Sequence, residues 1–447
     1  RCRLDSDATI KLPEKSRLVN TAASKEQKRL TTAVELDPPV RRVRLQLDPP
    51  TAGDPRPDAE RLSAALPPGV ESPGINVLRS LPVALRSDGF CVSAIIKENK
   101  LLRVEQCEPH RPLLGAAVDI GTTTIGVRVF DLESGEETGT AAAPNPQAAY
   151  GGDVASRATY AKEAREGLKI LSSLAAAGVN RLIESAAGKS SGRIAEVVVV
   201  GNPIMTHIFM GIDPSPISVS PFVPSSRGGV DAPADSLALK LMPGARAHIL
   251  PLVAGYVGAD TVGALLAALA SGEAALPALL IDFGTNAEIA LITESGMFAC
   301  AAAAGPALEG AQLSCGMGAY PGAVDSVSVG DGGELSFTTI SGAPAVGICG
   351  TGALDLLAAL LDCGAVEKSG RFADKQNWPE FLRARHTAGA AGRPAFFIEA
   401  SGVKDILLTQ SDIRQLQLAR SAIASGAALL LNAAGIGADA LGSVLLA

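Results

Sequence analysis

The feature that most constrains the fold is an acidic strand, turn and strand pattern that occurs twice. In the first copy, an apolar strand from Leu114 runs into Asp119, turns through Gly121 and three threonines, and resumes as "IGVRVFD". In the second copy, "ALLIDFGTNAEIALI" from Ala278 places Asp282 before Gly-Thr and another strand. The two aspartates lie about 160 positions apart. This repetition predicts two similar α/β subdomains that face each other across a cleft.

The turns have the chemistry of a phosphate site. A glycine turn lets the backbone approach an anion with several N–H donors, and threonine hydroxyls add donors without charge. One such turn is equally compatible with an ordinary hairpin, but its recurrence with matching strands favours phosphate binding. Asp119 and Asp282, at the strand ends, would hold Mg²⁺ through its water shell. The predicted phosphate ligands are Gly121, Thr122 and Thr123 in the first turn, and Gly284, Thr285 and Asn286 in the second.

The 447 residues exceed what one hydrophobic core usually serves, so the chain should form several compact units. Residues 1–33 are polar and Lys-rich, which is linker composition. Residues 34–108 contain two candidate strands around "ENK" and a short helix, as in a small α+β domain. Alternating strands and helices then predict two α/β subdomains, over residues 114–275 and 276–447. Aromatic residues make up only 4% of the chain, so small side chains must fill the cores.

Composition excludes several classes of function. The net charge of −7 gives no basic surface for nucleic acid, and the least charged stretch, residues 421–438, contains Ser, Asn and Gly as a buried helix does. The seven cysteines form no C-x-x-C pair, so no disulfide framework or compact metal motif is visible. Four histidines, none spaced i and i+4, leave little for zinc catalysis. These observations predict a cytoplasmic protein with no membrane contact.

Several motifs together resemble one family. "DIGTTTIGV" and "IDFGTNAEI" are similar to the two phosphate motifs of the actin, sugar kinase and Hsp70 superfamily, which closes on Mg-ATP. "NPQAAYGGDVASR", "GNPIMTH", "AAGPALEGA" and "GICGTGALD" resemble those of the ferredoxin-like reductive activators of corrinoid proteins. The resemblance covers residues 114–447. It implies ATP-dependent reduction of a partner corrinoid protein from Co(II) to Co(I), in support of a methyltransferase system.

The resemblance also implies parts outside the ATPase core. The family begins with a two-iron ferredoxin domain that takes electrons from a donor, and "RCRLDSDATIKLPEKSRL" resembles the last strand of that domain. Cys2 would then be the fourth ligand of a 2Fe-2S cluster, although a simple terminal thiol is the alternative. "GSVLLA" resembles the strand that enters the adenosine loop of the family. The chain is therefore expected to be a piece of a longer protein, with a homodimer possible.

Other residues leave alternatives open. Glu288 is a candidate general base for the attacking water. Asn202, after Gly201, either faces the nucleotide or caps the helix that begins at Pro203. Asp153 and Arg157 form either a surface ion pair or part of the nucleotide site. Ala287, Pro203 and Ile204 depart from the usual pattern of the family, which leaves the local turn geometry open. The remaining candidates are Gly350 and Gly352, which either face the nucleotide or permit close packing, and His207, which is expected in the core.

Two rival functions use the same phosphate site. The first is a small-molecule kinase, which needs a catalytic Asp aimed at a substrate hydroxyl, and the sequence singles out no such residue. The second is a nucleotide-dependent binding module without an enzymatic activity of its own. Both rivals share the duplicated turns, so the choice of activator rests on the family resemblance.

Overall fold

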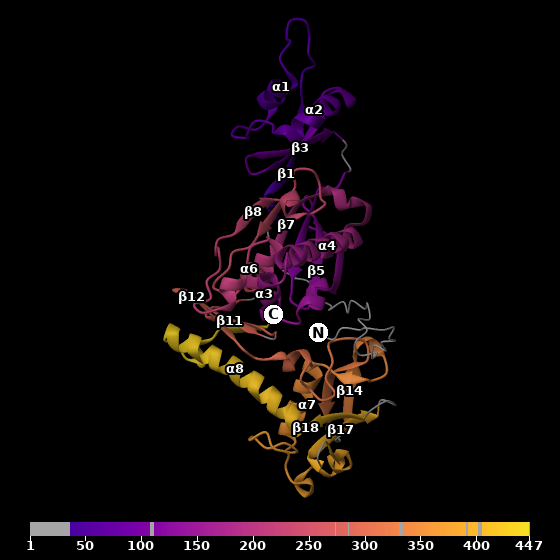
Figure 1. Cartoon of the computed structure of the whole chain (residues 1–447), viewed down its shortest axis with the longest axis vertical. Coiled ribbons are helices and arrows are strands. Elements are labelled where there is room, and N and C mark those ends of the chain that lie inside the picture. The colour runs from indigo at the N-terminus through magenta and orange to yellow at the C-terminus, as the bar shows by residue number, and fades with distance from the viewer. Residues whose placement is uncertain are drawn as a thin grey trace.

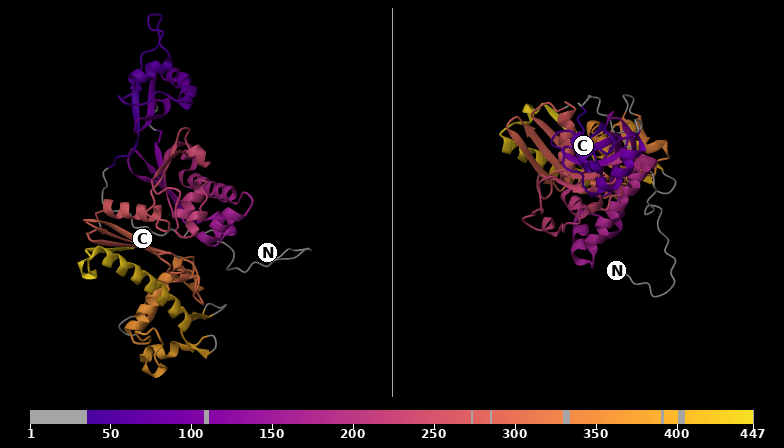
Figure 2. Two further views of the ribbon diagram at one scale, coloured as in Figure 1. Left: turned by 60° about the vertical axis from the view of Figure 1, so that its left-hand side comes forward. Right: turned by 90° about the horizontal axis from the view of Figure 1, so that it is seen from above.

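The computed structural model describes residues 36–107, 111–272, 274–284, 286–329, 334–389, 392–400 and 405–446. The molecule is elongated, with a small domain at one end and two larger lobes in succession below it (Figures 1 and 2). The predicted ferredoxin remnant, including Cys2, lies outside the described residues. In the part of the chain that is described, no helix combines the length and apolar character needed to cross a membrane.

The small domain is a three-stranded antiparallel sheet covered by two helices. The strands β1 (Val40–Gln46), β2 (Cys91–Lys97) and β3 (Lys100–Gln106) lie in the order β1-β2-β3, and the last two form the hairpin expected around "ENK". Helix α1 (Asp58–Ala65) was expected, whereas α2 (Ile75–Ser87), which contains Pro82, was not. Leu62 and Leu81 fill the core between the helices and the sheet.

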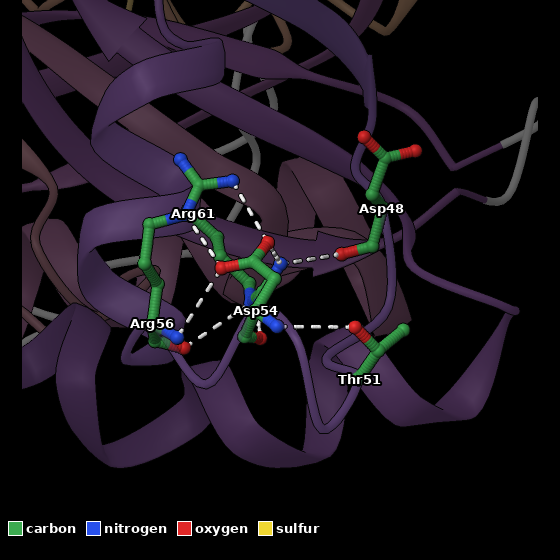
Figure 3. A network of polar contacts seen from close by, with 5 residues as sticks. All are labelled: Asp48, Thr51, Asp54, Arg56 and Arg61. Atoms are coloured by element: carbon green, nitrogen blue, oxygen red, sulfur yellow. Dashed lines mark hydrogen bonds and ion pairs between the residues drawn. The ribbon is translucent and has the colours of Figure 1, made fainter.

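A polar network fastens the loop between β1 and α1 (Figure 3). The Asp54 carboxylate accepts hydrogen bonds from Arg56 (2.8 Å) and Arg61 (2.7 Å), and its backbone N–H donates to Thr51 Oγ1. Arg61 is 4% exposed and also donates to the carbonyl oxygen of Asp48. The Arg56 and Arg61 guanidinium groups hold the pKa of Asp54 well below its usual range. The network gives a proline-rich loop a fixed conformation.

The upper lobe contains a six-stranded mixed sheet of order β6-β5-β4-β7-β9-β8. Its strands are β4 (Leu114–Ile120), β5 (Thr124–Asp131), β6 (Glu137–Pro144), β7 (Ile194–Val200), β8 (Val230–Pro233) and β9 (Arg246–Ile249). The helices of this lobe are α3 (Val154–Glu163), α4 (Gly167–Ala187) and α5 (Pro203–Phe209). The buried face of α4 packs on β4 and β5 through side chains such as Val179 and Ile183. The central strand β4 ends at the first predicted phosphate turn.

Buried ion pairs join the small domain to the upper lobe. The Lys97 ammonium, 7% exposed, contacts Glu196 Oε1 at 2.6 Å and Asp231 Oδ1 at 2.9 Å. Burial opposes the charge on Lys97, but the two carboxylates outweigh it, so the pKa of Lys97 is raised. Arg193 donates to both carboxylate oxygens of Glu105, at 2.6 and 2.7 Å. These contacts connect β2 and β3 to β7, to β8 and to Arg193, the residue before β7.

The second subdomain begins with a four-stranded sheet between two long helices. The strands β10 (Ala278–Asp282), β11 (Ala287–Thr293), β12 (Gly296–Ala302) and β19 (Ser443–Leu446) lie in the order β12-β11-β10-β19. Helix α8 (Gln410–Ala434) packs on one face through Ile423, and α6 (Ala259–Ala270) packs on the other through Leu265. Figure 2 shows the sheet between these helices. The sheet alternation sends Leu279 toward α8 and Leu280 toward α6.

The lower end of the molecule has its own core. Strands β13 (Ala323–Val329), β14 (Leu335–Thr339) and β15 (Gly347–Ile348) form one sheet, and β16 (His386–Ala388), β17 (Pro394–Ala400) and β18 (Asp405–Thr409) form another. Helix α7 (Gly350–Asp362) packs on β13. The only tryptophan of the sequence, Trp378, is 1% exposed in this core and stacks on Phe396.

Candidate functional site

The first turn, between β4 and β5, is held from behind by two buried polar side chains. Asn145 donates from Nδ2 to the Gly121 carbonyl (2.8 Å) and from its backbone N–H to the Thr123 carbonyl (2.8 Å). Arg157 donates from Nη2 to the Thr122 carbonyl at 2.6 Å. Asn145 and Arg157 are each 1% exposed. Three consecutive carbonyl groups of the turn are therefore directed toward the protein.

The direction of these carbonyls fixes the direction of the amides. In a planar trans peptide the C=O of one residue is antiparallel to the N–H of the next. The N–H groups of Thr122, Thr123 and Thr124 therefore point away from Asn145 and Arg157. This row of N–H donors has the arrangement of an anion cradle. A side chain at Gly121 would place its Cβ 2.6 Å from the Thr124 carbonyl oxygen, so the tight turn requires glycine.

Arg157 was one of two residues assigned to either a surface pair or the nucleotide site, and the surface alternative is wrong. Its guanidinium is buried among carbonyl groups, where it also donates to Gly151 (3.0 Å). Burial lowers the pKa of Arg157 to about 10, a value at which the group keeps its charge at neutral pH. Asp153 instead caps α3, because its carboxylate accepts from the Ser156 N–H at 2.7 Å. The two residues thus act on different backbone segments.

Asn202 links the end of β7 to the first turn. Its side-chain oxygen accepts from the Met205 N–H (3.0 Å) and caps α5, while its amide donates to Thr122 Oγ1 (3.1 Å). The capping alternative is confirmed, and the same side chain reaches the turn. Gly201 has φ +152°, and a Cβ there would lie 2.8 Å from the Ile120 carbonyl oxygen. His207 is 1% exposed, as expected for a core residue.

Helix α6 brings a further carboxylate to this point. The N–H of Ala259 donates to the Gly201 carbonyl oxygen at 3.0 Å, so the start of α6 rests on the end of β7. A Cβ at Gly258 would lie 2.7 Å from the Asn202 Cα and 2.6 Å from Asp260 Oδ1. Asp260 therefore lies next to Asn202, and its Oδ1 accepts from the Thr261 N–H at 2.8 Å.

The second turn adds two carboxylates beside Asp260. Asp282 ends β10 and pairs directly with Glu288 on β11. Burial, followed by the negative charges of Asp260 and Asp282, raises the pKa of Glu288 to about 8. Burial and Asp282 likewise raise the pKa of Asp260 to about 6. Three carboxyl groups from β10, β11 and α6 therefore share a poorly solvated place, where a negative charge on one disfavours ionisation of the others.

The carboxyl groups and the N–H row together fit the magnesium-bound phosphate that the duplicated turns imply. Repelling carboxylates with raised pKa values are stabilised when a cation comes near, and hard divalent cations prefer oxygen ligands. The nearby N–H row of the first turn provides the complementary anion site. The first turn reaches the carboxylates through Asn202 and the start of α6. A divalent cation carrying phosphate groups is therefore the ligand that these residues match best.

The remaining predicted residues lie in the second turn and at the start of α7. Gly284 lies in the second turn, where a Cβ would be 3.0 Å from the Asn286 carbonyl oxygen, and Thr285 lies outside the described residues. Gly350 and Gly352, at the start of α7, are buried where a Cβ would overlap the carbonyl groups of Leu308 and Val324. Close packing explains these two glycines without a ligand. Their placement beside a nucleotide stays a prediction.

The sequence reading missed Asp260, Asn145 and the supporting role of Arg157. Asp260 follows "GYVGA", a short glycine-containing segment before a helix, and that local pattern resembles neither of the two turns. Asn145 and Arg157 occur in "NPQAAYGGDVASR", which contributed to the family resemblance but carried no specific interpretation for Asn145. Only the fold brings these residues to the turn.

Comparison with known proteins identifies the same family over nearly the whole chain. Residues 29–110 match the RACo linker region, residues 114–270 match the RACo middle region, and residues 277–447 match the C-terminal domain of RACo, the ASKHA domain. The ASKHA description is that of the actin, sugar kinase and Hsp70 fold. The predicted fold class is thereby confirmed for the duplicated core.

Individual relatives agree with these matches. The corrinoid activation enzyme RamQ of Eubacterium limosum is 30% identical over 400 residues, which cover 87% of this chain and 67% of RamQ. The Co(II) methylated amine-specific corrinoid protein reductase of Methanosarcina barkeri is 28% identical over 291 residues, 57% of this chain and 52% of that protein. A solved structure named reductive activator for corrinoid, iron-sulfur protein superposes with TM-score 0.78 at 34% identity, covering 92% of this chain and 67% of its own. The chain thus spans about half to two-thirds of each relative's length.

Proposed function

Because the chain belongs to the family of reductive activators of corrinoid proteins, we propose that it is the ATP-dependent core of an enzyme that reduces a corrinoid protein from Co(II) to Co(I). The observation that supports the proposal is that Asn202, which contacts the first turn, and Asp282, which precedes the second turn, both lie near Asp260 at the start of α6. In the relatives, the names corrinoid activation enzyme and corrinoid protein reductase describe the same task. The partner would be the corrinoid protein of a methyltransferase system.

The residues divide the binding of Mg-ATP between the two turns. The N–H groups after Gly121 would donate hydrogen bonds to phosphate oxygens, with Thr122 and Thr123 adding hydroxyl donors. Asp119 and Asp282 would hold the magnesium through its water shell, as hard cations prefer. When bound, Mg-ATP supplies a phosphoanhydride bond whose hydrolysis drives a change of state. A bound cation would lower the pKa of Glu288, and the ionised Glu288 carboxylate would then accept a proton from the attacking water.

Helix α6 is suited to transmit the nucleotide state. It carries Asp260 at its start, covers the β10–β12 sheet with Leu265, and brings Gly263 near Val200 of β7. A shift of the carboxylates relative to the first turn therefore moves a helix that touches both sheets. If the two nucleotide states bind Co(II) and Co(I) partners unequally, the potential of cobalt shifts by about 59 mV for each tenfold difference in affinity.

The electron must come from a donor, and one electron per cobalt balances the reduction. We propose that the intact protein carries a 2Fe-2S cluster with Cys2 as one ligand, as the family resemblance implies. A cytoplasmic location follows from the same reading, since free thiols persist there. A homodimer is also proposed from the resemblance alone.

The proposal is tested with the protein that contains this chain and its ferredoxin module. Given a reductant, Mg-ATP and its corrinoid protein, it should convert Co(II) to Co(I), which optical spectroscopy follows directly. Asp282→Asn should abolish the ATP-dependent part, while Glu184→Gln, on the exposed face of α4, should not. Equal Co(I) yield with and without ATP would refute an ATP-driven activator.

The small-molecule kinase is the second candidate, because it would use the same turns. A kinase requires a carboxylate base at a substrate hydroxyl. Asp260, which the sequence did not single out, lies near Asp282 and could serve as that base. Transfer of labelled phosphate from ATP to a metabolite, with every corrinoid partner unchanged, would favour the kinase. ATP hydrolysis stimulated by a corrinoid protein would favour the activator.

A further inference from the structure

The small domain contains a cluster of thiol and carboxyl groups that the proposed function does not use. Asp88, Cys91 and Cys107 place one ligand atom each within 4.8 Å of the others. Cys91 is 6% exposed, Cys107 is half-buried and Asp88 is exposed. This is the one group of three or more potential metal ligands among the residues that the structure describes. It lies where the chain leaves the small domain.

Local structure explains why the three residues meet. Asp88 ends α2, and its carbonyl oxygen accepts from the Cys91 N–H at 2.8 Å across a turn in which Gly89 has φ +54°. Val92 pairs with Gln106 in the antiparallel β2–β3 hairpin. Cys91 precedes Val92 and Cys107 follows Gln106, so the two cysteines lie beside each other at the same end of the hairpin. Residues distant in sequence are thereby brought together at one end of the β2–β3 hairpin.

We propose that Asp88, Cys91 and Cys107 form a binding site for a thiophilic divalent cation of the zinc type. Two thiolates and a carboxylate are zinc ligands, and a tetrahedral zinc centre separates its ligand atoms by roughly 3.3–3.8 Å. Ligand atoms within 4.8 Å of one another are already close to that spacing. Three protein ligands leave a fourth position for water.

The charge around the cluster also matches such an ion. Arg44 donates from Nε to Cys91 Sγ at 3.4 Å, which is how a cationic neighbour supports a sulfur ligand from outside. Two thiolates, one carboxylate, one divalent cation and the Arg44 guanidinium sum to zero. The bound ion would join the end of α2 to both strands of the hairpin.

The test uses the full chain in a Cys2→Ser background, kept reduced and free of metal, with Co²⁺ as a spectroscopic probe and Zn²⁺ as its competitor. One equivalent of Co²⁺ should give thiolate charge-transfer absorption that Zn²⁺ removes. Cys107→Ser should abolish the signal, and Asp88→Asn should weaken Co²⁺ binding at least about tenfold. Cys363→Ser, a half-buried cysteine at the end of α7, is the matched control and should leave the signal unchanged.

Protection provides a second measurement that does not depend on the folding of a variant. Zn²⁺ should slow alkylation of Cys107 in the Cys2→Ser chain without slowing that of Cys363. Co²⁺ absorption that persists in Cys107→Ser, or disappears in Cys363→Ser, would overturn the site. The site would also be overturned if the protein bound no Co²⁺ and peroxide instead oxidised the Cys91 and Cys107 thiols to a disulfide.

Discussion

Replacing Glu288 by glutamine should stabilise the protein and flatten its dependence on pH. The carboxyl group of Glu288 is poorly solvated and faces Asp260 and Asp282, which raises its pKa to about 8. In the unfolded chain its pKa returns to the ordinary value of 4.5. At neutral pH the folded protein therefore holds a proton that the unfolded chain releases. Glutamine keeps the size of the side chain and removes this difference.

The sign and size of the effect follow from proton linkage. A carboxyl group whose pKa is higher in the folded state makes folding most favourable at low pH, and stability falls as pH rises from the unfolded value toward the folded one. Between about pH 5 and pH 7 this single group should reduce the free energy of unfolding by about 2 kcal/mol. About nine-tenths of Glu288 stays protonated at pH 7, so the charges of Asp260 and Asp282 are little changed by the substitution.

Urea unfolding followed by far-UV circular dichroism measures the effect at several pH values, without Mg²⁺. The Glu288→Gln protein should lose less stability than the wild type across this range, and Glu184→Gln should behave as the wild type. Mg-ATP should in addition release protons from the wild-type site, which calorimetry in two buffers of different ionisation enthalpy detects. Identical pH slopes for wild type and Glu288→Gln would refute the assignment of a repelling carboxyl cluster.

Three other substitutions test the buried contacts described above. Arg157→Met removes the donors behind the first turn and should weaken ATP binding at least about tenfold, measured by calorimetry, with a loss of about 1–3 kcal/mol in stability. Lys97→Met leaves Glu196 buried without its cation and should cost about 3 kcal/mol in urea unfolding, which the added Glu196→Leu change should largely restore. Gly350→Ala should disrupt packing and lower Tm, whereas Gly192→Ala, with open space at its Cβ, should not.

The elements that the sequence predicted well are those defined by local pattern. The first turn is recognisable because glycine, threonine and aspartate requirements fall within a few consecutive residues, and its antiparallel strands pair as expected, with Asp119 opposite Gly126. The β2–β3 hairpin is equally local. Helix α2 was missed because Pro82 lies inside it, and proline normally argues against a helix interior. Tertiary packing by Leu81 and Leu85 overrides that local preference.

The residues that the sequence could not place depend on distant contacts. Arg157 has the periodicity of a surface position next to Asp153, yet the turn at Thr122, 35 positions away, accepts its hydrogen bond in the interior. Cys91 and Cys107 show no motif spacing, because only the hairpin register brings them together. Such partners are selected by the fold and leave no periodic pattern in the sequence.

Helix α6 connects the two halves of the candidate site. Sequence patterns divide the chain after residue 275, but α6 precedes that division and packs on the second sheet through Leu265. Its first turn also rests on the end of β7, where the N–H of Ala259 meets Gly201. Asp260 therefore cannot move with one half alone. A cation that bound at Asp260, Asp282 and Glu288 would therefore change the free energy of the contact between the two sheets.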